Sequence, residues 1–438
     1  MSMNIIFIVI DTLRATRLGC YGFDKPTSPS LDELAGQGVR FSRCFAPGIP
    51  TTPAHATMYT GMHPLSHNIV CHGGQVDLDR KIPVLPELLQ RAGYTTAAVD
   101  NLFDVKPWLA RGYEFYINPG SRRRLSMMVS CEEINARAIP WIESHKSEQF
   151  FLFLHYWEPH TPYMPPKKYR NFYQEGRDPF SLEHSTFQNI KRQPFWEMFG
   201  DIWFDKLGPV TDAEYIASLY DAEIRHVDDG VAQILETLRK NGLEEDTLVV
   251  LTGDHGESMY QHDIYFDHHG LYDDVVHVPL MMRLPGRIEA GRTFEPMVQH
   301  LDLAPTLLEA AGAAVSAGMD GKSHWGAITG QGKQEGWDRV VSCECTWQAK
   351  WSLRTDTRKF ILSREQDHHN TPPRELYDLI GDPGETKNLA LENWREAQAM
   401  ELELENWIAE GLAKTGRKED PLRAQGVTLG KRWETYRS

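Results

Sequence analysis

Three short apolar runs constrain the fold of this chain more than any other feature. They are rich in β-branched and aromatic residues and span residues 5–10, 150–154 and 248–252. Runs of this kind, without polar alternation, are typical of strands buried on both faces of a parallel sheet. Asp11 follows the first run, and Asp254 and His255 closely follow the third. Because ligands bind at the carboxyl ends of such strands, these residues are candidates for a metal or catalytic site. The alternative for Asp11 is that it caps the segment that follows.

Helix signals alternate with the apolar runs. Ser30 and Glu33 form a capping box before an apolar helix face. Residues 86–92 are typical of a helix, residues 95–99 of a strand, and residues 211–240 of a long amphipathic helix. This alternation predicts a doubly wound α/β sheet covered by helices.

A second, smaller unit is predicted after the glycine-rich stretch 318–332. Short antiparallel strands are expected at residues 339–343, 351–354 and 359–362, followed by a helix at about residues 392–414. We therefore divide the chain into an α/β domain (1–332) and a C-terminal α+β domain with a tail (333–438). The aromatic stretch 167–207 is interpreted as an irregular insertion over the edge of the sheet, serving as a lid or an oligomer contact.

The composition excludes several classes of protein. The chain has 438 residues, 41% of them hydrophobic, which is enough for a sizeable core. Its net charge of −15 argues against a nucleic-acid-binding protein, so an anionic ligand would need a local metal or a helix N-terminus. The six cysteines lack zinc-ligand spacing, which favours reduced thiols in a cytoplasmic protein. The N-terminal apolar run is too short to span a membrane and lacks signal-peptide features, so no membrane partner is expected.

The segment Thr51-Thr52-Pro53 has the pattern of a loop that enters a helix. Proline suits the first helical position because its φ angle is preset and no N–H is needed there. The unpaired N–H groups of a first turn bind anions, and a hydroxyl held beside a metal can become a nucleophile for phosphorus or sulfur esters. Taken alone, the segment favours the simpler hypothesis that Thr51 caps the helix.

Histidines lie shortly after two of the predicted strands. Asp254 and His255 stand between glycines, where they can approach one cation closely, and His268 belongs to a dense cluster of acids and histidines just after them. His160 lies between prolines in a rigid loop, where functional residues concentrate. A histidine that only bonds to the backbone of its loop explains His160 equally well.

Together these segments resemble the sulfatase branch of the alkaline phosphatase superfamily over nearly the whole chain. The markers, in family order, are Asp11, Thr51-x-Pro53 leading to Thr60-Gly61, Pro159-His160-Thr161-Pro162, Thr252-Gly253-Asp254-His255-Gly256-Glu257, Val278-Pro279-Leu280, Asp302-Leu303-Ala304-Pro305-Thr306 and Glu375-Leu376-Tyr377-Asp378-Leu379. Each marker is weak alone, and together they are strongly specific. The resemblance implies an α/β/α sandwich with a large mixed, mostly parallel sheet, and a smaller C-terminal domain with a short antiparallel sheet and a helix.

The departures from this family bear on the reaction. Sulfatases carry Cys-x-Pro-Ser-Arg, whose cysteine or serine is converted to formylglycine; here Thr51 stands at that position and His55 at the arginine. Threonine cannot become formylglycine, because its β-carbon carries a methyl group. Two lysines that usually hold the sulfate are also replaced, one within residues 98–101 and the other by His268.

Residues 51–69 instead look like the nucleophile segment of nucleotide pyrophosphatase/phosphodiesterases. A threonine nucleophile with one metal is also similar to lipoteichoic acid synthases and phosphoethanolamine transferases. Nucleotide phosphodiesterases use two zinc ions, with an aspartate and a histidine four residues apart, and residues 159–164 contain no such pair. One metal is therefore expected. Thr12 stands where sulfatases have a second aspartate, so this metal site has fewer carboxylates than theirs.

The resemblance and its departures imply a metal-dependent phosphodiesterase or phosphonate monoester hydrolase. Thr51 would attack phosphorus and form a phosphothreonine. His160 and His268 would bind the non-bridging oxygens or protonate the leaving group. The expected ligands of one divalent cation, Mn²⁺, Zn²⁺ or Ca²⁺, are Asp11, Thr51, Asp254 and His255. The expected substrate-binding residues are His55, His72 and Asn101.

Two other hypotheses stay open. The same site could hydrolyse sulfate esters without formylglycine, because a monoanionic sulfate needs less positive charge than a phosphate monoester. The chain could also be a catalytically inactive scaffold, against which the retained metal-ligand candidates count. The expected partner is a small anionic ester rather than a nucleic-acid polymer, and the aromatic insertion is compatible with a homo-oligomer. The groups that recognise the substrate's alcohol are expected in the insertion and the tail.

Overall fold

Strand β1 (Asn4–Ile10) lies at the centre of a large sheet, between β6 (Phe150–Tyr156) and β7 (Thr247–Gly253), and runs parallel to both. The computed structural model describes residues 3–120, 128–174, 176–192, 196, 200–367 and 369–429. Every residue of these three strands is buried, as the apolar runs predict. The register pairs Val9 with both His155 and Thr252, so the three strands end at the same edge of the sheet.

In the described residues the sheet has nine strands, in the order β10-β2-β8-β7-β1-β6-β4-β5, with β9 beside β2. The other strands are β2 (Val39–Phe45), β4 (Thr95–Val99), β5 (Phe115–Ile117), β8 (His277–Arg283), β9 (Arg292–Phe294) and β10 (Val298–Gln299). Strand β8 runs antiparallel to β7 and β2, whereas the remaining pairs among these strands are parallel. The large mixed, mostly parallel sheet is therefore confirmed.

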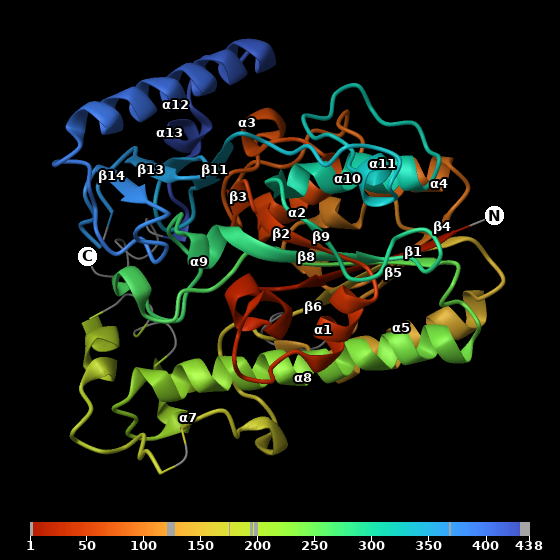
Figure 1. Ribbon diagram of the computed structural model, residues 1–438, viewed down its shortest axis with the longest axis horizontal. Coiled ribbons are helices and arrows are strands. Elements are labelled where there is room, and N and C mark those ends of the chain that lie inside the picture. The colour runs from red at the N-terminus through yellow and green to blue at the C-terminus, as the bar shows by residue number, and fades with distance from the viewer. Residues whose placement is uncertain are drawn as a thin grey trace.

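Helices cover both faces of the sheet (Figure 1). One face carries α1 (Pro29–Gly36), α5 (Cys131–His145) and α8 (Ala213–Lys240), and the other carries α2 (Thr51–Thr60), α4 (Leu85–Arg91) and α10 (Leu303–Ala310). The shorter helices are α3 (Pro64–His67), α7 (Asp205–Leu207), α9 (Asp273–Val276), α11 (Trp325–Ile328) and α13 (Pro421–Gln425). This arrangement is the expected α/β/α sandwich.

The N-terminus of α1 is capped from another helix. The sequence predicts a local capping box of Ser30 and Glu33, and this prediction is wrong, because the helix begins at Pro29 and its N-cap residue is Ser28, two residues before Ser30. The carboxylate of Asp228 in α8 instead accepts hydrogen bonds from the backbone N–H groups of Ser30 (3.0 Å) and Leu31 (2.8 Å). A buried carboxylate thus satisfies donors that sequence reasoning assigned to a neighbouring side chain.

The C-terminal sheet has five strands in the described residues, in the order β14-β13-β12-β11-β3. The strands β11 (Val340–Glu344), β12 (Lys350–Arg354) and β13 (Arg358–Ser363) match the sequence prediction, and α12 (Trp394–Thr415) packs against the sheet. Two strands were not predicted: β14 (Arg374–Asp378) and β3 (Gly48–Ile49). Strand β3 pairs in parallel with β11 and directly precedes the Thr51 segment, so the second sheet holds the entrance to α2.

The insertion at residues 167–207 contains short helical turns in its described part, at Lys167–Tyr169, Thr186–Arg192 and Gly200–Phe204, before α7. Trp203 is fully buried, and its ring lies 5.0 Å from the ring of Tyr163, which follows β6. Phe187 is also buried and packs edge-on against Phe204. These aromatic side chains anchor the insertion to the α/β domain.

All six cysteines lie in the described part of the chain and carry free thiols, as their spacing predicts. Burial raises the pKa of the Cys343 thiol in β11 well above its usual value, so this side chain packs as an apolar group. Within the same described residues, no helix has both the length and the apolar character that crossing a bilayer requires.

His63, between α2 and α3, joins the two sheets. Its Nε2 donates to the carbonyl oxygen of Val341 in β11 (3.0 Å), and its Nδ1 accepts from the backbone N–H of Leu65 (3.1 Å). The ring lies between Trp351 and Trp407, at centroid distances of 6.2 and 4.8 Å. Burial lowers the pKa of His63 to about 4, because the charged imidazole would be desolvated there and would lose its acceptor nitrogen.

We therefore expect this junction to lose stability in acid. An unfolded histidine takes up a proton near pH 6.5, whereas folded His63 does so only near pH 4, so unfolding becomes easier as the pH falls through this window. Between pH 7.5 and 5.0 the contribution of His63 to the free energy of unfolding should fall by about 2 kcal/mol.

Urea unfolding at the two pH values measures this loss. The variant His63→Gln should be less stable at pH 7.5 but should show a smaller drop on acidification, whereas the control His184→Gln, at a half-buried histidine outside the junction, should behave as the wild type. An equal drop in His63→Gln and the wild type would contradict the assignment.

Candidate active site

Asp11, Asp254 and His255 converge at the carboxyl edge of the large sheet. Asp11 directly follows β1, and the other two directly follow β7. All three side chains are fully buried, and the Nε2 atom of His255 lies 3.8 Å from Asp11 Oδ1 and 3.5 Å from Asp254 Oδ2. Four polar atoms of this cluster are buried without a hydrogen-bond partner: Asp11 Oδ1, Asp11 Oδ2, Asp254 Oδ2 and His255 Nε2.

The backbone fixes the direction of these ligand atoms. Asp254 Oδ1 accepts from the N–H groups of Thr12 (3.1 Å) and His255 (2.8 Å), which leaves Oδ2 for another partner. His255 Nδ1 donates to the carbonyl oxygen of Gly256 (2.9 Å), so in the neutral ring Nε2 carries a lone pair. Two carboxylates and one oriented imidazole nitrogen are a donor set that fits a divalent cation.

The electrostatics of the cluster also suit a cation. Burial, followed by the neighbouring charge of Asp11, raises the pKa of Asp254 well above its ordinary value. Burial also acts to raise the pKa of Asp11, but the close contact with His155 and the charges of His160 and His255 outweigh it and hold that pKa well below its usual range. Two carboxylates buried this closely repel each other, and a divalent cation between them would remove the repulsion.

Thr51 is the first residue of α2, and it is buried. Pro50 occupies the N-cap position, so the hypothesis that Thr51 is the cap is wrong. The placement of Pro53 at the first helical position is also wrong, because Pro53 is the third residue of the helix. The carbonyl oxygen of Thr51 accepts from Nδ1 of His55 (2.8 Å), and that imidazole lies 3.9 Å from Asp254 Oδ2. The first turn of α2 therefore lies against the carboxylate cluster.

His155 is a site residue that the sequence analysis did not single out. It is the penultimate residue of β6 and is fully buried. Its Nε2 lies 3.4 Å from Asp11 Oδ2, and its Nδ1 lies 3.5 Å from Asp100 Oδ1. Burial acts to lower the pKa of His155, but its contacts with Asp100 and Asp11 outweigh it and raise the pKa to about 10. A histidine inside an otherwise apolar, doubly buried strand was the signal that could have identified it.

His55, His155 and Asp254 form a second group of ligand atoms close enough to share one ion, and this group uses the same Asp254 as the first. His55 is fully buried, and its Nε2 has no hydrogen-bond partner. The predicted substrate-binding residue His55 thus borders the metal-ligand cluster directly.

His160 and His268 lie beside each other over the cluster. The His268 ring is 4.7 Å from the ring of His255 and 5.1 Å from that of His160. His268 Nδ1 lies 3.5 Å from Oε1 of Glu257, a fully buried carboxylate that the sequence analysis did not single out. Burial acts to lower the pKa of His268, but the ion-pair contact with Glu257 and the charge of Asp267 outweigh it and raise the pKa to about 10.

His160 fits both of its sequence interpretations. Its Nδ1 donates to the carbonyl oxygen of Thr161 (2.6 Å), so the ring is tied to its own loop, as in the simpler hypothesis. The ring also lies beside His268 and 5.6 Å from Trp157, within the candidate site. In the neutral ring this hydrogen bond leaves Nε2 as a proton acceptor.

The remaining predicted residues lie at the margin of the cluster. His72 Nδ1 is 3.0 Å from the hydroxyl of Thr52, and its backbone N–H donates to Thr346 of the C-terminal domain (3.0 Å). Asn101 Oδ1 accepts from the indole N–H of Trp157 (2.6 Å), and the Trp157 ring lies 4.8 Å from that of His155. Asn101 is thus linked to the cluster through Trp157.

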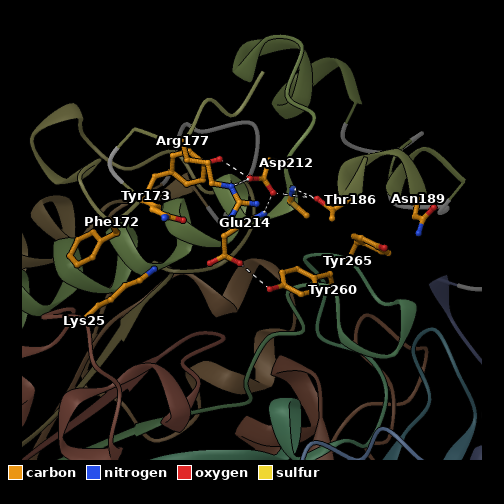
Figure 2. A pocket seen from close by; sticks show the side chains of 12 residues that line it. Lys25, Phe172, Tyr173, Arg177, Thr186, Asn189, Asp212, Glu214, Tyr260 and Tyr265 are labelled. Atoms are coloured by element: carbon orange, nitrogen blue, oxygen red, sulfur yellow. Dashed lines mark hydrogen bonds and ion pairs between the residues drawn. The ribbon is translucent and has the colours of Figure 1, made fainter. Parts of the chain in front are cut away.

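A cavity of about 710 Å³ separates the insertion from the start of α8 (Figure 2). Its lining combines aromatic and charged side chains, among them Tyr173, Arg177, Glu214, Tyr260 and Tyr265. None of its twelve described lining residues is among the predicted site residues. A role of the insertion in recognising the substrate therefore stays a prediction.

Comparisons with known proteins agree with this architecture. The sulfatase family model matches residues 3–313, and the model of the C-terminal region of N-sulphoglucosamine sulphohydrolase matches residues 261–411. An N-acetylglucosamine-6-O-sulfatase of Bacteroides thetaiotaomicron is 24% identical, over 88% of this chain and 82% of the relative. A multifunctional alkaline phosphatase superfamily protein, PehA, of Trinickia caryophylli is also 24% identical, over 88% of this chain and 91% of the relative.

A solved structure of similar fold is the phosphonate monoester hydrolase of Agrobacterium radiobacter. It aligns with a TM-score of 0.74 and 22% identity, and covers 94% of this chain and 96% of the hydrolase chain. At this identity the likeness establishes the fold, which confirms the large α/β sheet with a smaller C-terminal antiparallel sheet.

The carboxylate cluster yields a prediction about metal content. Replacing Asp11 or Asp254 by asparagine removes one anionic ligand, so each variant should lose one equivalent of divalent cation per chain relative to the wild type. Metal analysis after dialysis, with isothermal titration of Mn²⁺, Zn²⁺ and Ca²⁺, measures the difference, and affinity should fall at least about tenfold. Asp246→Asn, at an exposed position, should retain the wild-type content; equal content in all three variants would overturn the assignment.

Proposed function

Because the chain belongs to the sulfatase family of ester hydrolases, we propose that it is a metal-dependent hydrolase that cleaves phosphodiesters or phosphonate monoesters through Thr51. The observation that carries the proposal is the position of Thr51 at the start of α2, where His55 contacts both the Thr51 carbonyl oxygen and Asp254. The formylglycine nucleophile of sulfatases is made from a cysteine or serine at this position, and threonine cannot be converted to it. A hydroxyl nucleophile is instead suited to phosphorus chemistry.

Different residues of this chain have different roles in the proposed reaction. Asp11, Asp254 and His255 would hold one divalent cation, which would lower the pKa of a nearby hydroxyl and offset negative charge in the transition state. The oxygen of Thr51 attacks phosphorus in line and gives its proton to His160. The ester oxygen leaves, and a phosphothreonine forms that keeps the other substituent on phosphorus. Water then attacks the phosphothreonine and restores the hydroxyl.

Two histidines serve the charges and protons of the reaction. His268, paired with Glu257, brings positive charge to the non-bridging oxygens and a proton to the leaving group. His160 has its Nδ1 engaged with its own loop, so its Nε2 accepts a proton during the reaction. Asp11 and Asp100 hold His155 from both sides, which fixes the direction of the Asp11 carboxylate.

Sulfate-ester hydrolysis is the second candidate function. It is favoured by relatives such as the N-acetylglucosamine-6-O-sulfatase of Bacteroides thetaiotaomicron. A sulfate monoester and a phosphodiester both carry a single negative charge, so the charge of the site does not separate them. The identity of Thr51 favours phosphorus.

Thr51 provides the direct test of the mechanism. Thr51→Ala should lower kcat/KM for a phosphodiester by about 10³-fold or more, because no other group replaces the nucleophile, whereas Thr51→Ser should retain part of the activity. Rapid acid quenching followed by mass spectrometry should find a phosphorylated peptide that contains residue 51 in the wild type and in Thr51→Ser. Near-full turnover by Thr51→Ala would refute the mechanism, and Thr386→Ala, at an exposed threonine, is the matched control.

A substrate panel separates the two candidate functions. Aryl phosphodiester, phosphonate monoester, phosphate monoester and aryl sulfate are compared with added Mn²⁺, Zn²⁺ or Ca²⁺. The phosphodiester or the phosphonate should give the highest kcat/KM, and the phosphate monoester should be poor because its dianion needs more positive charge than histidines supply. A highest kcat/KM for the aryl sulfate would instead establish the sulfatase hypothesis.

A further inference from the structure

A second cluster of metal-ligand residues shares no member with the cluster around Asp11. Cys131 and Glu132 stand at the start of α5, His226 lies in the middle of α8, and Glu158 lies in the loop after β6. The two helices run side by side on one face of the sheet (Figure 1). One ligand atom from each of the four residues lies within 4.8 Å of every other.

Among His226, Cys131 and Glu132, two of the three interatomic distances match those around a zinc ion, and the third is a hydrogen-bond distance. His226 Nε2 lies 3.4 Å from Cys131 Sγ and 2.7 Å from Glu132 Oε1, and Cys131 Sγ is 3.6 Å from Glu132 Oε2. A tetrahedral zinc ion with bonds of about 2.0–2.3 Å holds neighbouring ligand atoms about 3.3–3.7 Å apart. A thiolate, an imidazole and carboxylate oxygens are also ligands that zinc accepts together.

The charges of the cluster call for a cation. Three carboxylates, those of Glu132, Glu158 and Glu223, surround the single imidazole of His226. One oxygen of Glu158 accepts from the backbone N–H of Cys131 (2.9 Å), and the other is buried without a hydrogen-bond partner.

Glu223 is placed to orient the imidazole. Its Oε2 lies 3.5 Å from Nδ1 of His226, on the opposite side of the ring from Cys131, and its Oε1 accepts from the backbone N–H of Met164 (2.8 Å). A carboxylate behind a histidine fixes the ring so that the other nitrogen faces a metal. His226 is buried and also packs against the ring of Tyr169, at a centroid distance of 5.0 Å.

We propose that Cys131, Glu132, Glu158 and His226 bind one zinc ion, separate from the cation held by Asp11. This ion joins the start of α5 and the middle of α8 to the loop that carries His160, since Glu158 is two residues before that histidine. Its role is to position this loop, and the proposal does not depend on which ester the enzyme cleaves.

Cobalt distinguishes this site from the cluster around Asp11, because that cluster contains no thiol. The full-length protein is stripped with a chelator and titrated with Co²⁺ under reducing conditions. The wild type should show a sulfur-to-cobalt charge-transfer band that Zn²⁺ removes. Cys131→Ser should lose the band, whereas Cys20→Ser and Asp11→Asn should keep it. A band that persists in Cys131→Ser, or no band in the wild type, would overturn the proposal.

Zinc stoichiometry supplies a second measurement that does not depend on the thiol. Glu132 has an exposed side chain, so Glu132→Gln removes one ligand without disturbing the core and should weaken zinc binding at this site at least about tenfold. His226→Gln should bind one zinc fewer per chain than the wild type. Circular dichroism in the presence of chelator establishes that each variant is folded. The zinc site would be contradicted if folded Glu132→Gln kept its zinc affinity and His226→Gln kept its zinc stoichiometry.

Discussion

Two carboxylates buried side by side, Asp11 and Asp254, set the main physical constraint on this structure. Burying like charges at short range is unfavourable unless cationic groups or a metal neutralise them. Around the pair the chain assembles His155, His255 and His55, and it leaves lone pairs of both carboxylates without other partners. This cluster therefore concentrates negative charge that a bound divalent cation would neutralise.

The parallel sheet and the C-terminal sheet bring different parts of the site together. The adjacent strands β6, β1 and β7 deliver His155, Asp11 and Asp254 to one edge. The segment that enters α2 reaches the same place because β3 is a strand of the C-terminal sheet and pairs with β11. The junction at His63 continues this connection, so the smaller sheet is part of the support of Thr51.

Helix α8 links the loops around the site. The hydroxyl of Tyr220 donates to the carbonyl oxygen of Thr12 (2.7 Å) and accepts from the backbone N–H of Arg14 (3.0 Å), which holds the turn after Asp11. Further along, Asp228 caps α1, and His226 with Glu223 contacts the segment that leads from His160. The amphipathic pattern of the sequence identifies this long helix. The pattern does not identify the polar residues through which the helix contacts the loops around the site.

The sequence by itself determined the alternation of strands and helices, the division into a large and a small sheet, and Asp11, Asp254 and His255 as metal-ligand candidates. Apolar runs and strand ends carry this information locally, because a buried strand must be continuously apolar and a parallel sheet binds ligands at its carboxyl edge. The tertiary structure alone decided the rest. His155 and Glu257 joined the site through spatial neighbours, β3 became a strand by pairing with a segment almost 300 residues away, and Asp228 replaced the predicted capping box of α1. Such pairings depend on contacts between distant residues, which no local pattern encodes.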